Sequence, residues 1–312
     1  MSRRESAVPK APVPNAIVPS ALAADPRFDD ALIDEIGAAM ISAARAGERI
    51  IRRGAERPGT LVWESKGPAD FLSEVDRDSE HAIRETLEHA LRDVLPGARV
   101  LGEATWTDDA IPTEPCFIVD PLDGTTNFLH GVPVYAVSIG ALVDGVPAAG
   151  VVLDVARNEL FAAARGRGAK RNGAPIHVST VRERERALIA TGFPFGEGAQ
   201  IARYARQFQP VAAVTAGIRR AGAAALDLAG VACGRYEGFW ELDLAPWDIA
   251  AGILLIEEAG GIVTGIDGTR ATVTTWPLVA GNPETHRWLL ETLQRADAAF
   301  VASDESPLGA SR

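Results

Sequence analysis

Apolar residues recur at helical spacing in two stretches near the start of the chain. Between Asp29 and Arg53 they fall on one face, at Leu32, Ile33, Ile36, Met40, Ala43, Ile50 and Ile51. After Asp76 they recur at four-residue steps, at Ile83, Leu87 and Leu91. A one-sided apolar stripe of this period is typical of a helix packed on a core. The pattern predicts two amphipathic helices, the second with Asp76 as its N-cap and Glu80 in its first turn.

Short runs rich in apolar and β-branched residues follow, and turn signals separate them. The predicted strands cover residues 100–102, 117–119, 134–143 and 146–153. Asp144-Gly145 joins the last two strands, and Asn172-Gly173 is a second pair of the kind that closes tight hairpins. This part of the chain is therefore predicted to be a mostly antiparallel sheet covered by the two helices.

From Leu188 onward the pattern predicts alternating strands and helices. Strands are expected at 188–190, 236–241 and 261–264, and helices at 200–213, 223–232, 247–258 and 283–294. Such alternation is typical of layered α/β packing. We predict an α+β fold, a layered α-β-α-β-α sandwich. Its expected parts are a disordered extension over 1–26, an N-terminal α+β half over 27–185 with the metal site, a C-terminal α/β half over 186–297, and a loose tail over 298–312.

Composition narrows the possible partners and the compartment. The chain has 312 residues, 47% of them hydrophobic, and a net charge of −11, which disfavours direct binding to nucleic acid or to an anionic membrane. No apolar run approaches the roughly 20 residues that cross a bilayer, and the first residues lack the apolar core of a secretion signal. Cys116 and Cys233 are expected to be reduced core thiols, so a cytoplasmic protein is predicted.

Three acidic residues stand at the ends of predicted buried elements. Glu103 follows the strand at 100–102, Asp120 follows the strand at 117–119, and Asp248 begins a helix directly after Trp247. A charge in such a place is costly unless a cation or hydrogen bonds compensate it, and converging oxygen ligands suit Mg²⁺. Taken singly, each has a plain alternative: an exposed strand end, a turn, or an acid at a helix N-terminus. The five histidines show no metal-ligand spacing.

The segment from Asp120 to Thr126, DPLDGTT, adds local geometry. Pro121 is expected to end the strand and Gly124 to permit a tight turn, so that Asp120 and Asp123 point into one space. The backbone amides around Gly124 and Thr125 would then open toward an anion, provided that a helix begins there. Alone, Asp-Pro followed by Asp-Gly is more often a simple turn. Combined with the other acids, the segment favours a site for a phosphoryl group and metal ions.

Longer strings carry a family resemblance. The string from Val119 to Phe128, VDPLDGTTNF, resembles the first signature of the inositol monophosphatase family, and Pro246 to Gly252, PWDIAAG, resembles the second. Further stretches, including TGFPF from Thr191 and RAGAAALDL from Arg220, are similar to bacterial members, and the resemblance spans residues 30 to 295. One position departs: most relatives have two successive glutamates where this chain has Glu103-Ala104.

The resemblance implies a set of metal ligands and catalytic residues. Glu103, Asp120 and the carbonyl of Leu122 would hold one Mg²⁺, and Asp120, Asp123 and Asp248 a second. A weaker third ion near Glu103 is typical of the family, and Ala104 leaves its occupancy open. Thr125, paired with Asp76 and close to Glu103, would orient the attacking water for in-line displacement at phosphorus.

The resemblance also implies a substrate site. Its expected residues, some shared with the metal site, are Asp123, Gly124, Thr125, Gly222, Ala223, Ala224, Glu241 and Asp248. Glu241 corresponds to the family residue that accepts hydrogen bonds from substrate hydroxyls. Residues 222–224 correspond to the wall of the substrate site beside it. The phosphate is expected on the amides of Gly124 and Thr125.

These residues predict a phosphoric monoester hydrolase. Its first candidate substrate is myo-inositol 1-phosphate, and histidinol phosphate, fructose 1,6-bisphosphate and adenosine 3′,5′-bisphosphate are alternatives because a metal core does not specify the leaving group. An alternative of another class is a binding protein associated with the transcription machinery, as some bacterial relatives are. The resemblance further implies a homodimer and inhibition by Li⁺.

Overall fold

The structure is a computed structural model that describes residues 29–57, 63–67, 70–103, 105–106, 113–194 and 198–304. The predicted extension over 1–26 lies outside these residues. The first sheet has seven strands, in the spatial order of their numbers: β3 (Arg99–Gly102), β4 (Cys116–Asp123), β5 (Ala136–Val143), β6 (Val146–Asp154), β7 (Glu159–Ala164), β8 (Ala169–Arg171) and β9 (Ala174–Ile176). Among the described residues, only the pair β3 and β4 is parallel in this sheet, which confirms the predicted mostly antiparallel arrangement.

Both predicted hairpin turns are present. Asp144 and Gly145 join β5 to β6 with φ angles of 52° and 71°, and Asn172 and Gly173 join β8 to β9 with φ angles of 50° and 81°. Positive φ at both central residues is the backbone that these residue pairs favour, and its twist matches that of the flanking strands.

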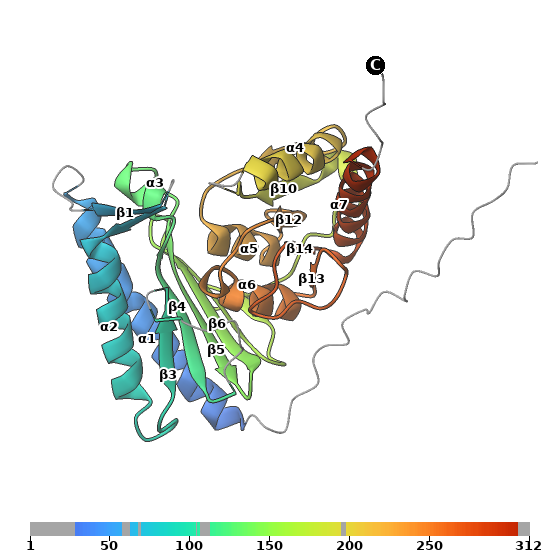
Figure 1. Cartoon of the computed structure of the whole chain (residues 1–312). Coiled ribbons are helices and arrows are strands. Elements are labelled where there is room, and N and C mark those ends of the chain that lie inside the picture. Colours follow the sequence, from blue (N-terminus) through green and yellow to red (C-terminus); the bar gives the residue numbers. More distant parts are fainter. Residues whose placement is uncertain are drawn as a thin grey trace, which may run out of the picture.

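Helices α1 (Asp30–Ala55) and α2 (Glu74–Ala90) pack on one face of the first sheet (Figure 1). A hairpin of β1 (Trp63–Gly67) and β2 (Asp70–Ser73), which the sequence pattern did not predict, precedes α2. The prediction of Asp76 as N-cap was wrong. Ser73 is the N-cap, and Asp76 is the third helical residue, whose Oδ2 accepts from the Ser73 amide at 2.9 Å. This reciprocal capping box moves the helix start back by three residues and places Glu80 beyond the first turn.

The second sheet has five strands in the order β11-β10-β12-β14-β13: β10 (Leu188–Thr191), β11 (Gly217–Arg219), β12 (Gly238–Glu241), β13 (Ile262–Gly265) and β14 (Leu278–Gly281). β10 runs parallel to β11 and β12, whereas β14 is antiparallel to β12 and β13. Strands β11 and β14 are additions to the predicted pattern. The predicted alternation with helices is confirmed by α4 (Gly198–Ala212), α5 (Ala224–Ala232), α6 (Pro246–Glu258) and α7 (Pro283–Asp304).

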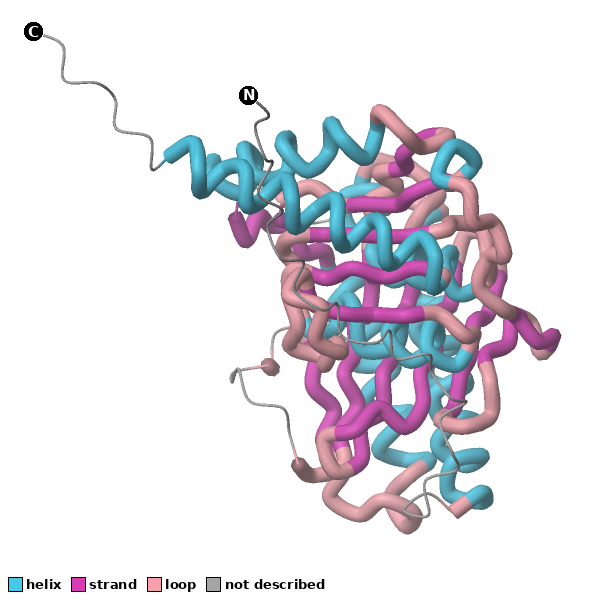
Figure 2. The backbone as a smooth tube through the Cα atoms, turned by 90° about the vertical axis from the view of Figure 1, so that its right-hand side faces the viewer, coloured by secondary structure: helices cyan, strands magenta, loops and turns pink. Residues whose placement is uncertain are grey.

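The elements stack as helices, sheet, helices, sheet and helices, which confirms the predicted sandwich (Figure 1). Helices α5 and α6 lie between the two sheets, and α4 and α7 cover the outer face of the second sheet, whose strands lie behind them in Figure 2. Helix α7 continues past its predicted end at Gln294 to Asp304, into the segment expected to be a tail. The boundary between the predicted halves stays a prediction, because α5 and α6 pack on both sheets.

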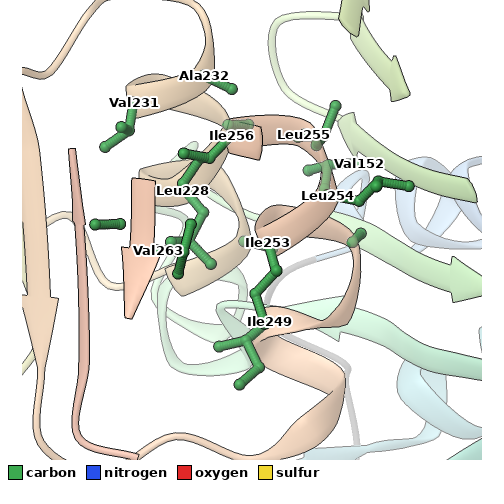
Figure 3. Close-up of a cluster of buried hydrophobic side chains, with 14 of the residues drawn as sticks. Val152, Leu228, Val231, Ala232, Ile249, Ile253, Leu254, Leu255, Ile256 and Val263 are labelled. Carbon is green, nitrogen blue, oxygen red and sulfur yellow. The ribbon is translucent and has the colours of Figure 1, made fainter. Parts of the chain in front are cut away.

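The layer between the sheets is largely apolar. Leu228 of α5 and Ile253 of α6 are buried with Val152 of the first sheet and Val263 of the second (Figure 3). Helix α6 lies directly on β5 and β6, because a Cβ added at Gly140 would be 2.6 Å from the Cβ of Ala250. This close packing fixes the N-terminus of α6, and with it Asp248, beside the first sheet.

Two expectations from composition can be compared with the structure. Cys116 and Cys233 are both free thiols, as predicted, and burial raises the pKa of the Cys116 thiol to about 11. Among the described helices, none combines the length and apolar character that a bilayer crossing requires.

Candidate active site

Strand β4 carries the centre of the site and is longer than predicted. It continues through Pro121 to Asp123, so the expectation that Pro121 ends the strand was wrong. The pairing with β5 shifts between Asp120 and Asp123, and proline is tolerated at such an irregularity because no regular ladder hydrogen bond is required of it. This irregular segment brings Asp120, the carbonyl of Leu122 and Asp123 to one end of the sheet.

Asp120 faces three other carboxylates. Burial raises its pKa well above the usual range, and the charges of Asp123, Asp248 and Glu103 raise it further. The opposing contribution is a hydrogen bond from the Leu122 amide to Asp120 Oδ1 at 3.0 Å. Like charges act on one another mainly over short distances in a protein, so the acids of β4, of α6 and of the residue after β3 lie near enough to interact.

Asp123 is held by the start of α5. Its carboxylate is buried, and its Oδ2 accepts from the amide of Ala225 at 3.0 Å. Burial raises the pKa of Asp123 to about 7, against the effect of the amides of Ala225, Leu226 and Ala224. The first turn of a helix offers amides without partners inside the helix, so α5 fixes this carboxylate and leaves its other oxygen for a ligand.

Asp248 enters from the first turn of α6. Its Oδ2 accepts from the Ala245 amide at 2.7 Å, and the side chain is half-buried. Burial and the charge of Asp123 raise its pKa to about 7, and Glu103 adds to the effect. Glu103 itself is half-buried directly after β3, whereas Ala104 and residues 107–112 lie outside the described residues.

The structure brings Asp76 and Thr125 together, from elements 49 residues apart. Thr125 Oγ1 lies 2.8 Å from Asp76 Oδ1 and 2.9 Å from the carbonyl of Leu122, so its one proton can go to either acceptor. Ser73 Oγ hydrogen-bonds to the other oxygen of Asp76. Burial raises the pKa of Asp76, and the hydrogen bonds from Ser73 and Thr125 oppose this. The threonine hydroxyl therefore links a buried carboxylate to the acidic cluster.

The turn at Gly124 rests against the predicted substrate wall. Gly124 has φ 87° and precedes α3 (Thr125–Leu129), and a Cβ there would lie 2.7 Å from the carbonyl oxygen of Val134. It would also lie 3.3 Å from the Cβ of Ala223 and from the carbonyl oxygen of Gly222. Only glycine fits both the backbone and the space. Asn127 ties the loops together, because its Nδ2 donates to Val134 O at 2.8 Å and to Ala221 O at 2.9 Å.

Glu241 is the last residue of β12, in the second sheet. Burial raises its pKa well above the usual range, with added effects from the charges of Asp248 and Asp227, and the charge of Arg220 opposes the shift. These interactions place Glu241 near both the acidic cluster and the loop of residues 220–224. Gly222 has φ 88°, Ala223 is buried, and Ala224 begins α5.

The donor set fits a hard divalent cation. Asp120, Asp123 and Asp248 form no ion pair with lysine or arginine in the described part of the chain, and the carbonyl of Leu122 adds a neutral oxygen beside them. As the side chains stand, no three His, Cys, Asp or Glu residues among those described converge tightly enough to hold one ion. Like charges repel, so we expect the carboxylates to draw together on a cation.

Protons and Mg²⁺ should compete for this cluster. The carboxyls of Asp123 and Asp248 have pKa values of about 7, against about 4 in an unfolded chain, so the folded metal-free protein holds protons more strongly. Its stability should therefore fall as pH rises from about 4 through about 7. Mg²⁺ should offset this loss, so that it raises the melting temperature more at pH 8 than at pH 5.5.

The Asp123→Asn variant is the control for this measurement, because it removes one titrating group with little change in shape. Its metal-free form should lose less stability between pH 5.5 and pH 8, and its response to Mg²⁺ should be smaller. An equal rise in melting temperature with Mg²⁺ at both pH values would contradict the competition.

Several residues that shape the site were not assigned by sequence reasoning. Ser73 could have been found, since Ser73-Glu74-Val75-Asp76 matches the capping-box spacing. Asn127 lies within the string VDPLDGTTNF, but its hydrogen bond to the loop of Ala221 joins residues 94 positions apart. The amide of Ala225 and the side chain of Arg220 act through the packing of α5 and the adjacent loop, for which no local signal exists.

The chain is similar to known proteins over most of its length. Residues 32–298 match the model of the inositol monophosphatase family. The "Nus factor SuhB" of Pseudomonas aeruginosa is 43% identical over 258 residues, which cover 81% of this chain and 94% of that protein. Among solved structures, the extragenic suppressor protein suhB of Bartonella henselae has a TM-score of 0.75 and 40% identity, over 83% of this chain and 98% of that one. The IMPase of Thermotoga maritima has a TM-score of 0.73 and 28% identity, over 83% and 96%.

Proposed function

The chain belongs to the inositol monophosphatase family, and from this premise we propose that it hydrolyses a small polyol phosphate with Mg²⁺, myo-inositol 1-phosphate being the first candidate. The observation that carries the proposal is the hydrogen bond from Thr125 Oγ1 to Asp76, in a cluster of acids that includes Asp120 and Asp123 of β4. Burying several carboxylates near one another lowers the free energy of unfolding. Such an unfavourable arrangement is typical of functional sites.

Each carboxylate has a proposed place in the metal site. Glu103, Asp120 and the carbonyl of Leu122 would hold one Mg²⁺, and Asp120 would share a second with Asp123 and Asp248. Bound there, Mg²⁺ would activate a water as a nucleophile and neutralise charge on the phosphoryl oxygens. A third ion near Glu103 would bind more weakly than the other two, because Ala104 stands where most relatives have a second glutamate.

The chain's own residues would orient the water and the substrate. Thr125 Oγ1, while donating to Asp76 at 2.8 Å, can accept a hydrogen bond from the attacking water and align it with phosphorus. The amides of Gly124 and Thr125 would receive the phosphate at the turn that begins α3. Glu241 would accept hydrogen bonds from hydroxyls of the leaving alcohol, which would rest against Gly222, Ala223 and Ala224.

A substrate panel tests this proposal. Phosphate release is measured from myo-inositol 1-phosphate, histidinol phosphate, fructose 1,6-bisphosphate and adenosine 3′,5′-bisphosphate, each with and without Mg²⁺. We expect the inositol ester to have the highest kcat/KM, and only with Mg²⁺. Turnover of histidinol phosphate alone would overturn the choice of substrate while retaining the phosphatase. Family membership also leads us to propose a cytoplasmic homodimer inhibited by Li⁺, which light scattering and an assay with LiCl would check.

A second candidate function is binding to the transcription machinery. It is favoured by the name "Nus factor SuhB" of the Pseudomonas aeruginosa relative, which is 43% identical to this chain. The two functions can coexist if they use different surfaces. Binding to purified bacterial RNA polymerase should survive in the Asp120→Asn variant if the roles are separate, and its loss in that variant would tie binding to the metal site.

A further inference from the structure

Gly192 and Glu241 lie side by side at the carboxyl ends of two parallel strands. Thr191 of β10 pairs with Trp240 of β12, and Thr191 Oγ1 donates to the carbonyl of Trp240 at 2.8 Å. The next residue on β10 is Gly192 and the next on β12 is Glu241. Parallel pairing in register therefore sets these two residues next to each other, where the site meets the second sheet.

The carboxylate of Glu241 occupies the space that a side chain at position 192 would need. A Cβ added at Gly192 would lie 1.8 Å from Oε1 and 2.3 Å from Oε2 of Glu241. Gly192 does not have the positive φ that favours glycine elsewhere in this chain, so its backbone would accept another residue. The contact with Glu241, and not the backbone, is therefore what requires glycine here.

Arg220 lies close to this pair of residues. The guanidinium carbon of Arg220 lies 5.3 Å from the centre of the Phe193 ring, and Nη1 of Arg220 lies 2.6 Å from a Cβ added at Gly222. Arg220 therefore lies near both Phe193 and Gly222, and its positive charge acts on Glu241. A methyl group at position 192 would displace the carboxylate, because the strand pairing fixes the backbone on both sides.

We propose that Gly192 is a specificity-determining residue that acts through Glu241. Because glycine has no side chain, the Glu241 carboxylate can occupy the position in which it accepts hydrogen bonds from the hydroxyls of the leaving alcohol. The enzyme thereby favours polyol phosphates over phosphate esters that lack hydroxyls. This inference rests on the proposed function, since it concerns the selectivity of the same site.

A double-mutant cycle tests the inference. The measured quantity is the kcat/KM for myo-inositol 1-phosphate divided by the kcat/KM for p-nitrophenyl phosphate, both with Mg²⁺. Gly192→Ala should lower this ratio about tenfold or more, as should Glu241→Ala, because each removes hydrogen bonds to substrate hydroxyls. The double variant should fall no further than Glu241→Ala, within about twofold, since interacting residues are not additive. Gly37→Ala, at a position with nothing within 4 Å of an added Cβ, is the matched control.

Different results would overturn the role of Gly192 and the proposed phosphatase activity. An unchanged ratio in Gly192→Ala, or an equal further loss in the double variant, would overturn the role of Gly192 while the phosphatase stands. A wild-type protein that hydrolyses neither ester would overturn the proposed function itself. If Gly192→Ala melts early, its ratio is measured below its melting temperature, and the double variant should be as stable as Glu241→Ala, because removing the carboxylate gives the methyl group its space.

Discussion

Replacing Asp120 with asparagine should lower kcat/KM for phosphate release by at least about a thousandfold. Asp120 is the carboxylate on which the charges of Asp123, Asp248 and Glu103 all act, and it is the ligand proposed to serve both Mg²⁺ ions. An amide of the same shape keeps the packing but removes the charge that would bind the ions. A loss of about 4 kcal/mol in transition-state stabilisation corresponds to that factor.

The same substitution should not destabilise the metal-free protein. It removes one of several like charges that repel one another, so the melting temperature without Mg²⁺ at pH 8 should equal or exceed that of the wild type. Asp144→Asn is a matched control: it lies in the hairpin at the opposite end of β5, where φ is 52° and asparagine is well tolerated. Activity of Asp120→Asn within tenfold of this control would contradict the proposed ligand role.

The second large effect is expected at Thr125. Thr125→Val keeps the shape of the side chain but removes the hydroxyl that lies 2.8 Å from Asp76 and 2.9 Å from the carbonyl of Leu122. The variant lacks the hydroxyl that we propose aligns the attacking water and connects it to the buried carboxylate of Asp76. We expect kcat to fall by about 10²–10⁴ with little change in KM, as for other losses of positioned proton acceptors.

Thr125→Ser is the informative partner of this variant. Serine retains the hydroxyl and loses only a methyl group, so it should keep most of the wild-type kcat, measured under saturating substrate and Mg²⁺. If the valine and serine variants had the same kcat within about threefold, the hydroxyl would have no part in orienting the water.

The fold could be predicted largely because its elements carry strong local patterns. The one-sided stripe from Leu32 to Ile51 and the pairs Asp144-Gly145 and Asn172-Gly173 each determine a local conformation that the tertiary structure retains. Predictions failed where distant contacts decide the outcome. Pro121 lies within β4 because the pairing with β5 shifts at that point, and α7 extends past Gln294. The strand's continuation through Pro121 has no signal in the adjacent residues, whereas Ala296, Ala298 and Ala299 after Gln294 are good helix formers.

The site shows the same division. The resemblance supplied Asp76 and Thr125 as a pair, and the structure places them in hydrogen-bond contact, although the local pattern suggested a different role for Asp76 at the helix start. The contact of Gly192 with Glu241 was not foreseen. It depends on the register of two strands about 50 residues apart. The glycine in TGFPF does not indicate which residue occupies the space beside it.

The most direct test of the central claim is release of inorganic phosphate from myo-inositol 1-phosphate by the purified full-length chain. Release should require Mg²⁺, stop when EDTA removes the metal, and return when Mg²⁺ is restored. Release that continues unchanged in EDTA would contradict the proposal that the acidic cluster around Asp120 works by holding metal ions. So would the absence of release from this ester and from the other three phosphate esters in the presence of Mg²⁺.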